Sequence, residues 1–238
     1  MSKEFKFKQF TIEQDRCAMK IGTDGILLGA WVELRDPYFI LDIGAGTGVI
    51  GLMMAQRSNA ELIDAIEIDD DAYEQCVDNF ENSPWNDRLF CYHASLDEFA
   101  EEMQDEEKYE LIISNPPFYT EDYKGNDQSR NQARFADALP FEDLVENVAL
   151  LLAEEGRFAV IIPYAEEENF LELARKVSLF PNRITRVRGT KDSPLKRSLL
   201  QLSLSETTVK ENELIIEISR HEYTPEYIEL VKDFYLKM

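Results

Sequence analysis

The chain has 238 residues, 44% of them hydrophobic, which is enough to build one sizeable core in a single domain. No run of 18 apolar residues occurs and the amino terminus lacks an apolar signal core, so we expect a cytoplasmic protein without membrane insertion. The 47 acidic and 25 basic residues give a net charge of −22, which argues against a broad basic surface for phosphate binding.

Apolar segments and amphipathic segments alternate along the chain, which predicts an α/β fold with a mostly parallel sheet and helices on both faces. We expect strands over residues 39–43, 62–67, 89–93, 109–114, 157–162, 183–187 and 198–205. Helices are expected over residues 48–56, 71–80, 96–104, 141–152 and 165–177.

The carboxyl-terminal third departs from this alternation. Only a short polar stretch, residues 189–194, separates the last two expected strands, so they should pair antiparallel. Residues 214–218 are a candidate for a further strand, and residues 225–237 are expected to form a closing helix. Its apolar face would contain Ile228, Val231 and Tyr235.

A glycine cluster follows the first expected strand. Gly44, Gly46 and Gly48 lie where a buried strand turns into a helix, and glycines are typical of a turn that a ligand approaches closely. Glu67 ends the next expected strand, 19 residues beyond Gly48, where βαβ units place an acid against ribose hydroxyls. The combination predicts a nucleoside-binding site, although the glycines alone also fit a turn without a ligand.

The spacing Gly-x-Gly-x-Gly places Val49 where a dinucleotide-binding loop requires its third glycine, which argues against NAD. The segment resembles the S-adenosylmethionine (AdoMet) loop of class I methyltransferases. In that fold Asp42 would lie near the cationic amino-acid end of the cofactor.

A second motif, Asn115-Pro116-Pro117-Phe118, follows the strand expected at residues 109–114. The Asn115 side-chain carbonyl and the Pro116 backbone carbonyl can accept both hydrogens of a planar amine, while Phe118 would stack on its ring. Those acceptors favour a transition state in which positive charge develops on nitrogen. The alternative is a strand that simply ends at prolines.

The stretch from residue 115 to residue 139 is too long for an ordinary connection, which indicates a functional or disordered loop. Its aromatic and basic residues fit base stacking and phosphate contacts, and we expect Tyr119, Arg130 and Arg134 to contact substrate. A solvated lid is the alternative.

Charge is distributed unevenly along the chain. Residues 61–107 contain 17 acids and one base, whereas residues 175–197 contain eight bases and one acid. A one-sided positive surface is therefore compatible with the negative total, although a charge run is commonly just a solvated face. Three scattered cysteines and two histidines indicate free thiols and no metal site.

Residues 7–10 and 15–31 resemble the amino-terminal signature of the bacterial tRNA adenine-N6 methyltransferases that modify adenine 37 of a valine tRNA. Further matches lie at residues 83–85, 111–119, 130–134 and 234–238, so the resemblance spans nearly the whole chain.

The resemblance implies AdoMet-dependent transfer of a methyl group to N6 of an anticodon-loop adenine, with tRNA as partner and no obligate protein partner. It also implies that residues 1–36 cover the cofactor site of a core formed by residues 37–238. Thr23 and Asp24 become cofactor-side residues. Ser95 stands where many relatives have an aspartate that accepts from the cofactor's adenine amine, and Asp97 is the alternative acceptor.

Other functions remain open at this point. A glutamine amide in a release factor would suit the same Asn-Pro-Pro-aromatic motif, although only 40 residues precede Leu41, where those enzymes usually carry a helical domain. An exocyclic amine in another RNA or in DNA is a further alternative, as is a non-catalytic AdoMet-binding module.

Overall fold

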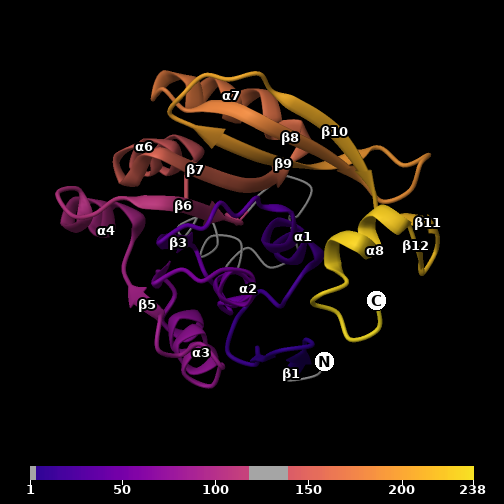
Figure 1. Ribbon diagram of the computed structural model, residues 1–238, viewed down its shortest axis with the longest axis horizontal. Helices are drawn as coiled ribbons and strands as arrows, with labels where there is room; N and C mark the ends of the chain where they lie inside the picture. Colours follow the sequence, from indigo (N-terminus) through magenta and orange to yellow (C-terminus); the bar gives the residue numbers. More distant parts are fainter. Residues whose placement is uncertain (1–3, 118–138) are drawn as a thin grey trace, which may run out of the picture.

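The computed structural model describes residues 4–117 and 139–238 of the protein. Its centre is an eight-stranded sheet with the order β10-β8-β9-β7-β6-β3-β4-β5 (Figure 1). These strands are β3 (Phe39–Ile43), β4 (Leu62–Glu67), β5 (Leu89–His93), β6 (Tyr109–Ser114), β7 (Leu152–Pro163), β8 (Phe180–Arg188), β9 (Leu195–Ser203) and β10 (Lys210–Ile215).

Strand direction confirms the expected fold class. Neighbouring strands are parallel except at β9, which runs antiparallel to both β7 and β8. The antiparallel pairing of the two strands that flank residues 189–194 is therefore confirmed. Strand β10 adds a further parallel strand at the outer edge, beyond β8.

Helices cover both faces of the sheet and divide its core into two apolar clusters. One face carries α1 (Thr23–Trp31), α2 (Val49–Arg57), α3 (Asp70–Glu81) and α8 (Pro225–Val231). The other face carries α4 (Leu96–Met103), α6 (Phe141–Leu151) and α7 (Glu167–Lys176), with the 3-10 turn η2 (Tyr164–Glu166) before α7. Within the described residues no helix is both long and apolar enough to span a bilayer.

Local sequence explains where the elements lie. Parallel strands buried on both faces are rich in apolar residues, as in β3, where Asp42 is the polar exception, and in β6 over residues 111–113. Side-chain caps start several helices: Asp69 accepts from the amide of Ala72 before α3 (2.9 Å), and Thr224 accepts from that of Tyr227 before α8 (3.2 Å).

Two short hairpins lie outside the main sheet. Strands β1 (Glu4–Lys6) and β2 (Thr11–Glu13) pair near the amino terminus, and β11 (Glu217–Ser219) pairs with β12 (Glu222–Tyr223) before α8. The sequence did not predict β1 and β2, because three-residue strands are too short to show a periodic pattern.

The expected closing helix over residues 225–237 is wrong in length. Helix α8 ends at Val231 because the following residues pair with the amino-terminal segment. The Lys8 amide donates to the Phe234 carbonyl (2.9 Å), and Phe7 forms an isolated bridge with Tyr235. Its buried face also differs from the prediction: Val231 is fully buried, whereas Ile228 is 37% exposed.

Candidate functional site

The carboxyl ends of β3, β4 and β6 lie side by side at one edge of the sheet, because β3 pairs with β4 on one side and with β6 on the other. The glycine loop follows β3, Glu67 ends β4, and Asn115 follows β6. This carboxyl edge is where open α/β sheets bind ligands. The structure therefore brings the two sequence motifs together (Figure 1).

All three glycines of the loop have left-handed backbone angles, with φ of 72° at Gly44, 56° at Gly46 and 76° at Gly48. A Cβ at Gly48 would lie 2.6 Å from a ring carbon of Phe80 and 2.9 Å from the Cys76 sulfur. A Cβ at Gly44 or Gly46 would meet no atom of the described residues within 4 Å. Gly48 is thus required by packing, whereas open space beside the other two leaves room for a ligand.

Glu67 ties the glycine loop to the end of β4. Its Oε2 accepts from the amide of Gly46 (2.8 Å), while its Oε1 accepts from the amides of Ile68 (2.9 Å) and Asp69 (3.0 Å). Three of about four acceptor positions of the carboxylate are used, which fixes its orientation. One position remains for a ribose hydroxyl.

Asp42 is completely buried beneath the loop. Its Oδ2 accepts from the Gly51 amide (3.0 Å), and its Oδ1 has no hydrogen-bond partner among the residues that the structure describes. Burial, with a smaller contribution from the Glu67 charge, raises the pKa of Asp42 to about 7. A buried acceptor without a partner fits the cationic end of AdoMet, which would restore the charged carboxylate.

Asn115 is half-buried at the end of β6. The Ser114 hydroxyl donates to the Ile43 carbonyl (3.0 Å) and fixes this end of β6 against β3. The Asn115 side chain makes no hydrogen bond within the described part of the chain, so its amide is free to bind a ligand. Pro116 is buried, while Phe118, Tyr119, Arg130 and Arg134 lie outside the described residues.

Helix α1 begins next to Asn115. The position that a Cβ would take on Gly25 lies 3.8 Å from the Asn115 Nδ2. Thr23 is exposed in the same first turn, and the Asp24 carboxylate accepts from the Arg197 Nε (2.8 Å). Both expected cofactor-side residues therefore lie at the carboxyl edge.

A family model described as "Methyltransferase small domain" matches residues 25–163, more than half of the chain. The chain belongs to this methyltransferase family. A Christiangramia forsetii protein named tRNA1(Val) (adenine(37)-N6)-methyltransferase is 63% identical over 235 residues, 98% of either chain. A Flavobacterium johnsoniae protein of the same name is 62% identical over 236 residues, covering 98% of this chain and 100% of that protein. These relatives confirm the resemblance that the sequence motifs indicate.

Solved structures support the fold of this methyltransferase. A predicted O-methyltransferase from Agrobacterium tumefaciens matches it with a TM-score of 0.70 at 20% identity, covering 89% of this chain and 96% of that one. At that identity the likeness concerns the fold alone.

Ser95 has a structural role in the methyltransferase. Its hydroxyl accepts from the Glu98 amide (3.3 Å), and its own backbone amide donates to the Glu98 carboxylate (3.1 Å), which forms a capping box at the start of α4. The Asp97 carboxylate accepts from the Asn147 side chain (2.7 Å). Whether either residue also contacts the cofactor adenine stays a prediction.

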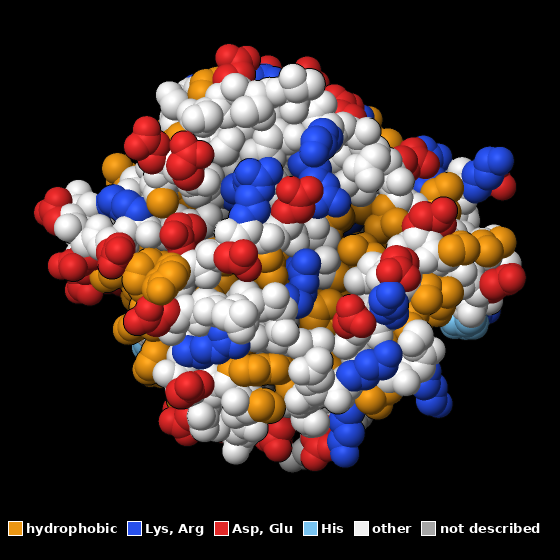
Figure 2. All heavy atoms as spheres, in the orientation of Figure 1, with side chains coloured by type: hydrophobic (Ala, Val, Ile, Leu, Met, Phe, Trp, Pro, Cys, Tyr) orange, Lys and Arg blue, Asp and Glu red, His pale blue; other side chains and the backbone are white. Residues whose placement is uncertain are grey.

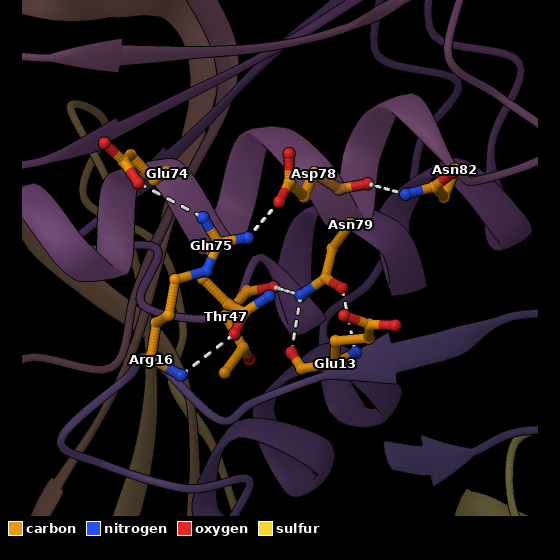
Figure 3. Close-up of polar contacts among 8 residues, drawn as sticks. All are labelled: Glu13, Arg16, Thr47, Glu74, Gln75, Asp78, Asn79 and Asn82. Carbon is orange, nitrogen blue, oxygen red and sulfur yellow. Dashed lines mark hydrogen bonds and ion pairs between the residues drawn. The ribbon is translucent and has the colours of Figure 1, made fainter. Parts of the chain in front are cut away.

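Two buried amides on α3 were not among the residues predicted from the sequence. Asn79 accepts from the Glu13 amide (2.9 Å) and donates to the carbonyls of Glu13 (2.8 Å) and Thr47 (2.9 Å) (Figure 3). Gln75 accepts from the Arg16 amide (3.1 Å). These contacts fasten the amino-terminal segment to the glycine loop. Two amides four residues apart on the otherwise apolar face of α3 were the available signal.

Four arginines of the basic segment are held in ion pairs. The pairs and their N–O distances are Arg183–Glu33 (3.6 Å), Arg186–Glu167 (2.6 Å), Arg186–Glu211 (2.8 Å), Arg188–Glu213 (2.8 Å) and Arg197–Asp24 (2.8 Å). Figure 2 shows basic and acidic side chains intermixed over the face drawn. Half of the eight basic residues in this segment are therefore neutralised by acids of neighbouring elements.

Proposed function

We propose that this methyltransferase transfers the methyl group of AdoMet to N6 of adenine 37 in a valine tRNA. The observation that carries the proposal is the Asn115 amide, which has no partner among the described residues and lies beside the glycine loop, in a chain 63% identical to a protein named for this reaction. A tRNA substrate implies a cytoplasmic enzyme, and we expect no obligate protein partner.

The cofactor-binding residues are assigned from the geometry at the carboxyl edge. Asp42 offers its unpartnered Oδ1 to the cationic end of AdoMet, and Glu67 offers its remaining acceptor position to the ribose. Gly44 and Gly46 leave the space that the cofactor needs. AdoMet supplies an electrophilic methyl group, and the chain's own residues place the acceptor nitrogen.

Residues 1–36 are assigned the role of covering this cofactor site. Support comes from Asn79, which joins the Glu13 backbone to the Thr47 carbonyl of the glycine loop. Thr23 and Asp24, which begin α1 within this segment and next to Asn115, are then positioned on the cofactor side.

Asn115 and Pro116 orient the adenine amine. An aromatic exocyclic amine is a poor nucleophile because its lone pair is delocalised into the ring. The side-chain carbonyl of Asn115 and the backbone carbonyl of Pro116 would accept its two hydrogens and aim the lone pair at the methyl group. Both acceptors bind more strongly as positive charge develops on the nitrogen, which lowers the barrier.

Substrate class is the first point to test. We expect labelled AdoMet, incubated with the enzyme, to transfer its methyl group to total tRNA from a strain that lacks the gene. Nucleoside mass spectrometry should identify the product as N6-methyladenosine. Ribosomal RNA, DNA and a release factor are included in the same assay, and label in any of these with none in tRNA would overturn the assignment.

A further inference from the structure

The turn between β8 and β9 carries two basic side chains that the fold does not use. Lys191 and Lys196 are exposed, and neither ammonium group forms an ion pair or hydrogen bond in the part of the chain that the structure describes. In contrast, two arginines of the same hairpin form ion pairs: Arg188 with Glu213 and Arg197 with Asp24. Asp192 is the exposed acid of the turn. Because two exposed lysines stand against this one acid, the turn has a net positive charge.

The hairpin lies at the carboxyl edge of the sheet. Strand β8 ends at Arg188, beyond which the chain turns and returns as β9, whose Arg197 pairs with Pro163 at the carboxyl end of β7. Only β7 separates β9 from β6. Two strand spacings of about 4.8 Å place β9 about 10 Å from the strand that ends at Asn115.

Helix α1 links the hairpin directly to the site. Arg197 donates to Asp24 at 2.8 Å, and the adjacent Gly25 packs against Asn115, with 3.8 Å between its Cβ position and the Asn115 Nδ2. Lys196 precedes Arg197 in the chain. An RNA strand that extends from a base bound at Asn115 along the carboxyl edge of the sheet, on the side of β7 and β9, would pass this hairpin.

Hydrogen bonds within the turn hold it in place. The Ser193 hydroxyl donates to the Thr190 carbonyl and accepts from the Thr190 amide, both at 2.8 Å. One Arg188 nitrogen donates to the carbonyls of Lys191 and Ser193, each at 3.2 Å. A fixed turn loses little conformational entropy when its side chains bind. The turn projects at the right of the view (Figure 1).

We propose that the β8–β9 hairpin is a phosphate-binding surface for the RNA substrate, with Lys191 and Lys196 contacting backbone phosphates next to the base held at Asn115. The proposal rests on tRNA methylation as the function. It explains how a chain of net charge −22 holds a polyanion: a small unneutralised basic surface lies beside the site while the arginines around it are paired.

The test is a Lys191→Gln/Lys196→Gln double variant with a Lys176→Gln/Lys210→Gln control. The control removes the same charge from exposed lysines before the start of β8 and at the start of β10, away from the carboxyl edge. Affinity for the valine tRNA transcript is measured by filter binding at several KCl concentrations, alongside kcat, KM and AdoMet affinity.

For the hairpin variant we expect tRNA binding weaker by on the order of tenfold near physiological salt, and a salt-dependence slope smaller by about 1–2, because two phosphate contacts are lost. KM for tRNA should rise with kcat and AdoMet affinity unchanged, while the control stays within twofold of wild type. Equal slopes for wild type, variant and control would overturn the hairpin assignment. Absence of tRNA binding by the wild-type enzyme would instead overturn the proposed function, and the hairpin assignment with it.

Discussion

At the scale of single residues, Asn115 decides whether the site is catalytic. Asn115→Ala removes one acceptor that favours the transition state, so we expect kcat to fall on the order of 10²- to 10³-fold, as when one oxyanion-hole donor is removed. AdoMet affinity should stay within twofold, measured by calorimetry. Asn59→Ala, which changes an exposed asparagine before β4, is the matched control. Loss of cofactor binding together with activity would contradict the assigned role.

The raised pKa of Asp42 leads us to expect that AdoMet affinity depends on pH. Burial raises its pKa to about 7, so the carboxyl is partly protonated near neutral pH in the free enzyme. A cationic ligand prefers the carboxylate, and AdoMet affinity should therefore increase several-fold from pH 6 to pH 8. Asp42→Asn should bind AdoMet weakly with a flat profile, whereas Asp87→Asn, at an exposed aspartate, should match wild type. A profile unchanged by Asp42→Asn would refute this explanation.

The same raised pKa affects the stability of the free enzyme with the opposite sign. Between the unfolded value of 3.8 and about 7, the folded state binds more protons than the unfolded state. The contribution of Asp42 to the free energy of unfolding therefore falls as the pH rises through that window. Urea denaturation without AdoMet, compared between wild type and Asp42→Asn, measures this contribution.

Alanine variants of Gly46 and Gly48 distinguish a glycine that leaves space for a ligand from one that the packing of the fold requires. Gly48→Ala combines left-handed strain with a Cβ 2.6 Å from Phe80, so we expect a loss of about 2–4 kcal/mol in unfolding free energy. Gly46→Ala adds strain alone, about 1–2 kcal/mol, because no atom of the described residues lies within 4 Å of the added Cβ. Its larger effect should be weaker AdoMet binding. Equal destabilisation by both, with normal cofactor affinity for Gly46→Ala, would mean that no ligand occupies that space.

At the scale of elements, α3 connects the amino-terminal segment to the glycine loop. Asn79→Leu leaves the backbone groups of Glu13 and the Thr47 carbonyl without partners, so we expect a loss of about 2–4 kcal/mol. Asn82→Ala, at the exposed residue that directly follows α3, should cost under about 0.5 kcal/mol. Urea denaturation gives both values.

Limited proteolysis distinguishes local release of the amino-terminal segment from destabilisation of the whole fold. If Asn79 holds the amino-terminal segment, Asn79→Leu should expose residues 4–22 to protease while the remainder of the chain stays resistant. Uniform digestion of the variant would show instead that Asn79 supports the whole fold. Cleavage no faster than in Asn82→Ala would contradict the assigned connection.

The sequence predicted the elements of the main sheet well and the small peripheral ones poorly. Buried parallel strands such as β3 and β6 are rich in apolar residues, which separates them from the amphipathic helices. The helix expected over residues 225–237 was wrong because a tertiary contact, the pairing of Phe7 with Tyr235, ends it early. Contacts between the two chain ends leave no local pattern.

In the site, too, residues with a local sequence pattern could be predicted, whereas residues defined by tertiary contacts could not. The glycine loop, Glu67 and Asn115 follow strand ends, where topology alone brings them together, so they could be predicted from the sequence. Asn79 could not, because its partners are backbone groups 66 and 32 residues away. The ion pair between Arg186 and Glu167 could not be predicted either, because the sequence does not show which acids of other elements lie next to the basic segment.

At the scale of the whole molecule, the proposed hairpin surface is what reconciles a strongly acidic chain with a polyanionic substrate, because its two lysines form no ion pair with the described residues while the arginines around it are paired. The sheet brings both motifs to one edge, and α1 links that edge to the β8–β9 hairpin through Asp24. Cofactor, target base and phosphates are thus assigned to one side of the molecule. An anticodon-loop base is already unpaired, which keeps the cost of extruding it below that of a duplex base.

The most direct test of the central claim compares methyl transfer to an unmodified valine tRNA transcript with transfer to the same transcript carrying adenine 37→guanine. We predict one N6-methyladenosine per molecule in the first and none in the second, with Asn115→Ala on the order of 10²- to 10³-fold slower on the first. Equal methylation of the two transcripts, or N6-methyladenosine mapped to another position, would contradict the account.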